Sequence, residues 1–214
     1  PATSRSTLRI PPGISLPLTP RLQAAIDTPE MRRLARVGQL GLVSLVYPGA
    51  VHSRFEHSLG VFRLAVAFVD RLQADTTFAE LVSSEDASAF LAASLLHDVG
   101  HWPFCHPIED MRLAEFPRHE SFLRGILLGG ELADVLRRDW GVAPERVASL
   151  VEGTAADPAG RLLASLLSGP VDVDKMDYLA RDSLHAGVPY GNHFDQERLV
   201  SSLCIDETGT SLAI

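Results

Sequence analysis

Apolar residues in this chain recur mostly at three- and four-residue steps, which is the period of an α-helix. The clearest run spans residues 55–72, and the residues on its expected buried face are Phe55, Leu59, Phe62, Val66 and Val69. Alternation typical of β-strands occurs only in the tail, at 202–205 and 211–214, around an Asp-Glu-Thr-Gly turn. We therefore expect a mainly α fold with one small C-terminal β-hairpin.

Helix starts can also be placed from the sequence. Thr19-Pro20 and Thr28-Pro29 each pair an N-cap residue with a proline at the first helical position, so a short helix should begin at each. Further helices are expected at 86–96, 107–115, 120–128, 132–140, 144–151, 158–167 and 173–186. Residues 1–18 contain several prolines and should form an extended arm on the body, 19–200 one domain, and 201–214 the start of the hairpin, with truncation of a longer protein left open.

Length and composition limit the class of protein. The 214 residues suffice for one domain, and no stretch approaches the roughly 20 uncharged apolar residues of a membrane helix. A net charge of −8 argues against an extended surface for duplex DNA, although a local basic pocket remains compatible with it. Two cysteines cannot form a disulfide framework, and the N-terminus lacks the pattern of a signal peptide, so we expect a cytoplasmic protein.

Five of the eight histidines fall in two groups. His52 and His57 lie in HSRFEH, and three more lie in LLHDVGHWPFCH, where His97-Asp98 ends an apolar helical run. Adjacent helical side chains point about 100° apart, so an imidazole and a carboxylate at these positions can bind one ion from neighbouring directions. A single His-Asp dipeptide is more often a buried histidine beside its neutralising partner, and both interpretations stay open at this point.

Carboxylates crowd a third segment, VDVDKMDYLARD. On a helix, Asp174, Tyr178 and Asp182 share one face, whereas Asp177 points toward Arg181. The alternative is a solvated acidic helix start that the helix dipole favours. Lys175, the only lysine of the chain, and Arg54, three residues before His57, would suit a substrate with several phosphates.

The three motifs, in this order, resemble those of the HD-domain metal-dependent phosphohydrolases. The resemblance is strongest to deoxynucleoside triphosphate triphosphohydrolases, namely the animal dNTPases that join a sterile-alpha-motif to an HD domain and the bacterial dGTPases. It runs from about residue 28 to 195 and includes the QLG of Gln39 to Gly41. It implies an HD-domain helical bundle.

The resemblance also implies roles for individual residues. The metal ligands would be His57, His97, Asp98 and Asp174, binding Fe, Mn, Ni, Co or Zn, with Mg on the substrate phosphates. Arg54, Lys175 and Tyr178 match positions that bind phosphates, and Gln39 and Asp182 match positions that hold the sugar. His101, His106 and His119 would line the phosphate path, with His106 as the acid/base poised by Glu109. His52, His185 and His193 are interpreted as structural.

The implied reaction releases a deoxynucleoside and inorganic triphosphate after water attacks the α-phosphorus. Trp102 stands where the animal enzymes have glycine, and Met176 replaces a tryptophan; these two departures from the family pattern bear on the substrate rather than on the metal. Alternatives are nucleoside monophosphates, cyclic or oligonucleotide phosphodiesters, and a non-catalytic nucleotide-sensing module. We expect a nucleotide partner, a homo-oligomer, no membrane association, and nucleic-acid binding at most as a side activity.

Overall fold

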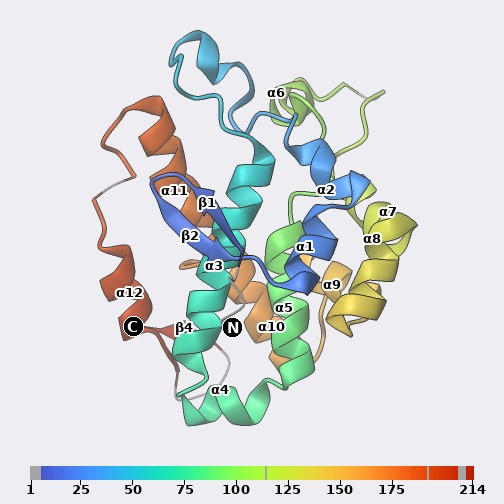
Figure 1. Ribbon diagram of the computed structural model, residues 1–214, viewed down its shortest axis with the longest axis vertical. Helices are drawn as coiled ribbons and strands as arrows, with labels where there is room; N and C mark the ends of the chain where they lie inside the picture. The colour runs from blue at the N-terminus through green and yellow to red at the C-terminus, as the bar shows by residue number, and fades with distance from the viewer. Residues whose placement is uncertain (1–5, 114, 192, 207–210) are drawn as a thin grey trace.

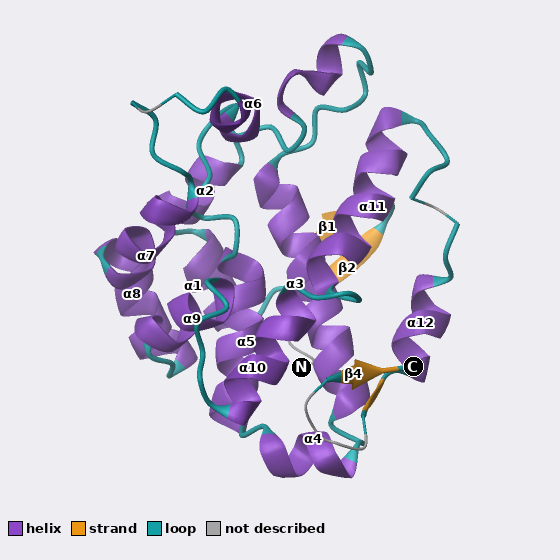
Figure 2. Cartoon of the chain, turned by 180° about the vertical axis from the view of Figure 1, so that it is seen from behind, coloured by secondary structure: helices purple, strands orange, loops and turns teal. Residues whose placement is uncertain are grey.

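The computed structural model describes residues 6–113, 115–191, 193–206 and 211–214. Within them the chain is mainly helical (Figures 1 and 2). The helices are α1 (Pro20–Ile26), α2 (Pro29–Leu34), η1 (Gly41–Leu45), α3 (Arg54–Leu72), α4 (Thr76–Leu81), α5 (Ser84–Leu96), α6 (Cys105–Asp110), α7 (Glu120–Leu128), α8 (Gly130–Val135), η2 (Leu136–Trp140), α9 (Pro144–Val151), α10 (Pro158–Leu167), α11 (Val173–Ala186) and α12 (Gln196–Ser202). The strands are β1 (Thr7–Ile10), β2 (Ile14–Pro17), β3 (Cys204–Ile205) and β4 (Leu212–Ala213). The mainly α fold is confirmed.

Helix α5 forms the centre of the bundle. Its residues from Ala89 to Leu96 are all buried, because α3, α9 and α10 pack around it. Helix α3 in turn lies between α5 and α11, as Figure 1 shows. The loops at one end of α3 and α5 and the start of α11 therefore meet, which brings the three sequence motifs together.

Side-chain caps start most of these helices where the sequence indicates. The hydroxyls of Thr19 and Thr28 accept hydrogen bonds from Leu22 N and Met31 N, so the two short helices are confirmed. Three helices were missed: the short 3-10 helix η1, and α4 and α12, although Asp75 and Asp195 cap the last two in the same way. An aspartate before a short polar helix is a weak signal in sequence because it is equally common in turns.

The buried face of α3 differs from the expected one. Leu59 and Phe62 are buried, but Val66 is 41% exposed. The helix buries a broader surface that also includes Leu64, Phe68 and others, because α5 and α11 contact it from different sides. A single face was the wrong expectation for a helix with neighbours on two sides.

The N-terminal arm is also more regular than expected. β1 and β2 pair antiparallel, with Ile10 opposite Ile14, and the hairpin packs on α3. The prolines that suggested an irregular arm lie in the turn and at the end of β2, where no ladder hydrogen bond is lost. The expectation that only the tail forms a hairpin was therefore wrong.

Three other segments depart from the predicted bounds. α6 begins at Cys105 and ends at Asp110, because Arg112 adopts a left-handed conformation (φ 53°). The helix expected at 132–140 is α8 followed by the π-turn η2. In the tail, β3 pairs with β4 as expected, whereas its turn lies outside the described residues. None of the described helices combines the length and apolar character that crossing a bilayer requires.

Candidate active site

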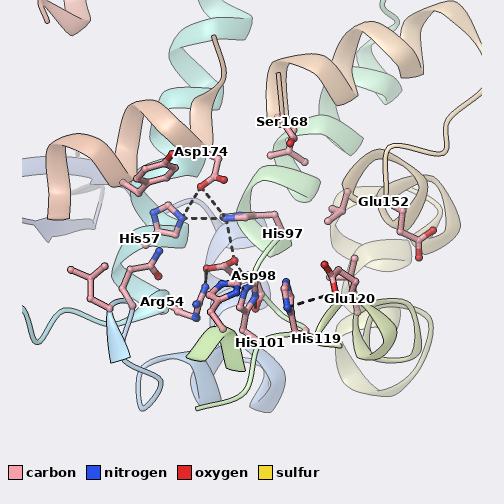
Figure 3. Close-up of a pocket in the computed structure, with 18 of the residues that line it drawn as sticks. Arg54, His57, His97, Asp98, His101, His119, Glu120, Glu152, Ser168 and Asp174 are labelled. Carbon is pink, nitrogen blue, oxygen red and sulfur yellow. Dashed lines mark hydrogen bonds and ion pairs between the residues drawn. The ribbon is translucent and has the colours of Figure 1, made fainter. Parts of the chain in front are cut away.

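A cavity of about 450 Å³ opens where α3, α5 and α11 meet the loops after α2 and α5. Its volume is in the range of small-molecule sites. It is lined by eleven of the thirteen residues singled out in the sequence: Gln39, Arg54, His57, His97, Asp98, His101, His106, His119, Asp174, Tyr178 and Asp182. Figure 3 shows His57 of α3, His97 and Asp98 just after α5, and Asp174 of α11 pointing toward one another.

Three of the four expected metal ligands form a tight group. The Nε2 atoms of His57 and His97 lie 3.2 Å apart, and Asp174 Oδ1 lies 3.0 Å from the first and 3.6 Å from the second. Ligands bound at about 2.1 Å to one ion in tetrahedral or octahedral geometry lie about 3.0–3.4 Å from one another. Two of the three separations lie in this range, and a small movement of Asp174 toward His97 would bring the third into it for a single transition-metal ion.

The hydrogen bonds of both imidazoles leave the metal-facing nitrogen free. His57 Nδ1 lies 2.9 Å from Asp177 Oδ2, and His97 Nδ1 lies 3.0 Å from the carbonyl oxygen of Ser94. These acceptors hold a proton on each Nδ1, so Nε2 is the nitrogen of each ring that would bind an ion at the common point.

Asp98, the fourth expected ligand, lies beside this group. Its Oδ1 is 3.5 Å from His97 Nε2 and 3.1 Å from His101 Nδ1, while its Oδ2 accepts a 2.8 Å hydrogen bond from Arg54. Asp98 and Arg54 are both buried. The aspartate thus joins the metal group to Arg54 and to the second set of histidines.

Charges in the site shift several pKa values. Burial alone would lower the pKa of His57, but the hydrogen bonds to Asp174 and Asp177 outweigh it and raise the pKa to about 10. Burial would raise the pKa of Asp174, but the two histidines hold it below its usual range. Burial lowers the pKa of His101 to about 3. The group formed by His57, His97 and Asp174 therefore favours a positive charge, whereas the neighbouring imidazole of His101 is neutral at pH 7.

His101, His106 and His119 form a second group, as the sequence suggested. His101 Nε2 lies 3.2 Å from His106 Nε2, and the rings of His101 and His119 have centroids 3.9 Å apart. Arg33 of α2 fixes the loop that carries His101 by donating to the carbonyl oxygens of Val99 and His101, each at 2.5 Å. The cavity thus holds a metal group and an imidazole group side by side.

Two predicted residues do not line this cavity. Glu109 Oε1 accepts from the backbone N–H of His119 at 2.6 Å and lies 3.0 Å from its Nδ1, whereas the distance from Glu109 Oε2 to His106 Nδ1 is 3.8 Å. The carboxylate thus holds His119 rather than the expected His106. Lys175 Nζ donates to Asp172 at 2.6 Å and to the Gly169 carbonyl at 2.7 Å, which turns it away from the cavity.

The wall formed by α11 and the loop after α2 carries the residues expected at the sugar. Backbone bonding between Gln39 and His52 places Gln39 beside the start of α3, and its buried Oε1 has no hydrogen-bond partner among the described residues. Tyr178 and Asp182 line the same wall. Asp182 Oδ1 is held by His52 Nε2 at 2.8 Å, so His52 supports a site residue and is more than a general structural histidine.

Sequence analysis missed other residues that support or line the site. Asp177 is held by two hydrogen bonds from Arg181, each 2.8 Å long, and Arg181 also donates to Glu56 at 2.7 Å. The pair Asp177 and Arg181 was visible as an i, i+4 spacing, but nothing in the sequence indicated that it faces His57. Glu120, Glu152 and Ser168 form the opposite wall in Figure 3, and they come from segments without a motif.

Comparisons with known proteins agree with this geometry. The chain is 42% identical over 181 residues to the uncharacterized protein YwfO of Bacillus subtilis, a match that covers 82% of this chain and 38% of that protein. It is 33% identical over 226 residues to the human deoxynucleoside triphosphate triphosphohydrolase SAMHD1, covering 92% of this chain and 36% of that protein. The chain therefore spans well under half the length of these curated relatives.

Solved structures give the same picture. A hypothetical protein from Aquifex aeolicus superposes with a TM-score of 0.81 at 31% identity, covering 98% of this chain and 53% of that one. A phosphohydrolase from Bacteroides thetaiotaomicron superposes with a TM-score of 0.76 at 31% identity, covering 98% and 49%. The family model described as HD domain matches residues 54–182, more than half of the chain. Because the model matches more than half of the chain, over the segment that contains the four expected ligands from His57 to Asp174, the chain belongs to the HD domain family.

Proposed function

We propose that this chain carries the active site of a metal-dependent phosphohydrolase that converts a dNTP to a deoxynucleoside and triphosphate. The observation that carries the proposal is that one cavity brings together the His57–His97–Asp174 group, three further histidines and the Gln39–Tyr178–Asp182 wall. The similarity to the deoxynucleoside triphosphate triphosphohydrolase SAMHD1 supports the substrate class.

His57, His97 and Asp174, with Asp98 beside them, would hold the ion. Two imidazoles and two carboxylates suit Fe, Mn, Ni, Co or Zn. When bound, such an ion would act as a Lewis acid on a phosphate oxygen and would lower the pKa of a bound water toward neutral pH. Asp177 and the Ser94 carbonyl keep the two ligand imidazoles in the tautomer that binding requires.

Residues of the chain itself would protonate the leaving oxygen and bind the sugar. In the proposed reaction a water oxygen bonds to the α-phosphorus and the bond from phosphorus to O5′ breaks. His106, which is half-exposed at the cavity, would protonate the leaving O5′. Burial and the charge of Arg54 lower the pKa of His106 in the free protein, and the negative charge of a bound phosphate would oppose that shift. Gln39 would accept a hydrogen bond from a sugar hydroxyl through its unpaired Oε1.

The charge of the cavity favours a second metal ion on the substrate if the substrate is a triphosphate. Arg54 is the only lysine or arginine among the described residues that line the cavity, and it is already paired with Asp98. The same lining contains five carboxylates: Asp98, Asp174, Asp182, Glu120 and Glu152. We therefore propose that the phosphates enter as a Mg²⁺ complex, which reduces their repulsion from these groups.

One observation favours a second candidate, a phosphohydrolase for less charged substrates such as nucleoside monophosphates or cyclic and oligonucleotide phosphodiesters. Lys175, expected on the phosphates, is instead committed to Asp172 and Gly169. A substrate with one phosphate needs fewer cations than a triphosphate does. The same metal group can serve both chemistries.

A substrate panel separates these candidates. The purified protein is incubated with the four dNTPs, nucleoside monophosphates and cyclic dinucleotides, in Mn²⁺ and in Mg²⁺, and products are identified by chromatography. Free inorganic triphosphate with deoxynucleoside supports the first candidate, and orthophosphate or opened phosphodiesters support the second. Turnover that persists unchanged in His97→Ala rejects both, and no turnover of any substrate despite nucleotide binding would indicate a sensing module.

We also propose a homo-oligomer. The segment around η1 exposes three large apolar side chains, Leu45 (79%), Val46 (74%) and Val51 (71%). Residues 40–53 contain no aspartate, glutamate, lysine or arginine, so these side chains form an exposed apolar patch of the kind that marks an interaction surface. Figure 1 shows this segment projecting from one end of the bundle. A second copy that covers it would bury these side chains. Sedimentation of the wild type and of a Leu45→Ser, Val46→Ser double variant tests this, and a wild-type monomer at all concentrations would reject it.

A further inference from the structure

A sulfur-containing group of potential metal ligands lies next to the HD ligands. His101, Cys105, His106 and His119 each offer one ligand atom, and these four atoms all lie within 4.8 Å of one another. His101 and Cys105 are buried, and Cys105 is a free thiol. The neighbouring His57–His97–Asp174 group has no sulfur, so the two groups differ in the metals they favour.

The imidazoles of this second group are oriented as metal ligands are. His101 Nδ1 lies 3.1 Å from Asp98 Oδ1, and His119 Nδ1 lies 3.0 Å from both carboxylate oxygens of Glu109. The Glu109 carboxylate accepts the Nδ1 proton of His119, and the carbonyl oxygen of Asp98, 3.2 Å from His101 Nδ1, accepts that of His101, so Nε2 is the nitrogen of each ring left to bind an ion. Carboxylates in this position orient ligand imidazoles and raise their basicity in known metal sites.

The spacing repeats that of the HD ligands. His101 Nε2 and His106 Nε2 lie 3.2 Å apart, the same separation as between His57 Nε2 and His97 Nε2. Nitrogen atoms bound to one tetrahedral Zn²⁺ at about 2.0–2.1 Å lie about 3.3–3.4 Å apart. Side-chain adjustments of about 1 Å or less would therefore bring the four ligand atoms around one ion.

We propose that His101, His106, His119 and Cys105 form a second site for a thiolate-binding divalent metal of the Zn²⁺ class, and that an ion there inhibits hydrolysis. Binding releases the thiol proton of Cys105 and forms one metal–sulfur and three metal–nitrogen bonds. The inhibitory part rests on the proposed function, because an ion on His106 occupies the ring needed to protonate the leaving oxygen. The site would thus couple turnover to the availability of zinc.

The first test uses Co²⁺ as a spectroscopic probe of the whole chain. Wild-type protein should bind two equivalents, one of which produces a thiolate-to-cobalt charge-transfer band. Cys105→Ser should lose that band and bind the second ion at least about tenfold more weakly. Cys204→Ser, which removes the other free thiol, should behave like wild type. A wild-type stoichiometry of one, or a band that survives in Cys105→Ser, would overturn the proposal.

The second test separates this site from the HD ligands and from the proposed activity. His97→Ala should still bind one Co²⁺ through sulfur, with circular dichroism confirming its fold, and loss of the sulfur band in a folded variant would reject an independent site. Added Zn²⁺ should inhibit the Mn²⁺-loaded wild type, and Cys105→Ser should retain basal turnover but need at least about tenfold more Zn²⁺. Equal inhibition of both proteins overturns the regulatory part. If no substrate is turned over, the cobalt results still decide whether the metal site exists.

Discussion

Asp177 lies directly behind His57, with Asp177 Oδ2 2.9 Å from His57 Nδ1, on the side of the ring opposite Asp174. Both partners are buried, and Arg181 holds the carboxylate from behind with two hydrogen bonds. Asp177 therefore sets the orientation and tautomer of a metal-binding imidazole without itself facing the cavity.

Replacing Asp177 with asparagine should weaken Mn²⁺ binding about 10- to 100-fold, as is usual when a carboxylate behind a ligand histidine is lost. Asparagine keeps the shape but not the charge that stabilises the Nδ1–H. Titration calorimetry measures the change. Asp70→Asn, an exposed carboxylate on the same helix as His57, is the control and should bind Mn²⁺ like wild type. Equal affinity in all three proteins would contradict the orienting role.

Gly60 of α3 should be intolerant of a side chain. A Cβ there would overlap the carboxylate of Asp177 and the guanidinium of Arg181. Gly60→Ala should lower the free energy of unfolding by about 3 kcal/mol, because it separates a buried ion pair. Gly125→Ala in α7 is the matched control, since its Cβ would meet nothing within 4 Å and should stabilise the helix by up to about 1 kcal/mol. Urea denaturation measures both, and a stable Gly60→Ala protein would refute the close packing.

Asp157 should stabilise the fold at neutral pH but not in acid. It caps α10 by accepting from Gly160 N at 2.8 Å, and Arg146 donates to both of its oxygens. The hydrogen bonds from Arg146 and Gly160 lower the pKa of this carboxyl below its ordinary value of 3.8. Asp157→Ala should therefore cost about 1–2 kcal/mol above that pH.

The sign of the pH effect follows from the lowered pKa. The contribution of Asp157 is complete above the unfolded-state pKa of 3.8 and is lost as pH falls through the lower folded-state pKa. Urea unfolding at pH 7, 5, 3 and 2 should show a constant difference between the wild type and Asp157→Ala at pH 7 and 5, and a difference that shrinks from pH 3 to pH 2. Asp134→Ala, which removes an exposed carboxylate 3.8 Å from Arg137, should have little effect at any of them. A difference that stays constant down to pH 2 would argue against an ionised cap.

Metal binding should release protons. The pKa of His57 is raised to about 10 and that of His97 is also raised, so the metal-free group holds protons at neutral pH that the ion must displace. The apparent affinity for Mn²⁺ should therefore increase between pH 6 and 9, by about tenfold per unit for each proton released. Calorimetry in two buffers with different ionisation enthalpies counts the protons. An affinity independent of pH would show that the group is already unprotonated.

Much of the fold and the ligand set could be predicted because the signals are local. Thr19, Thr28 and the periodic apolar runs fix helix starts and lengths within a few residues. His57, His97 and Asp174 could be grouped because they lie in three motifs whose order resembles one family. Such signals depend on neighbours in sequence, which the sequence displays directly.

Partners across the fold could not be predicted in the same way. Glu109 pairs with His119 rather than with His106 because the chain between them turns back, and Lys175 bonds to Asp172 and Gly169 rather than facing the cavity. The N-terminal hairpin was missed because its prolines look like breaks until the turn places them outside the ladder. Each case depends on tertiary contacts that compete with local preference.

The hydrogen bonds from Arg33 to the carbonyl oxygens of Val99 and His101 determine how far the chain can be truncated. A fragment cut to the matched segment, residues 54–182, would keep every candidate ligand yet discard both the guanidinium that clamps the loop after the His-Asp doublet and the amide of Gln39. Such a fragment could still bind a metal, but the loop of residues 99–101 would lose the hydrogen bonds that fix it. The minimal working unit therefore has to begin upstream of α2.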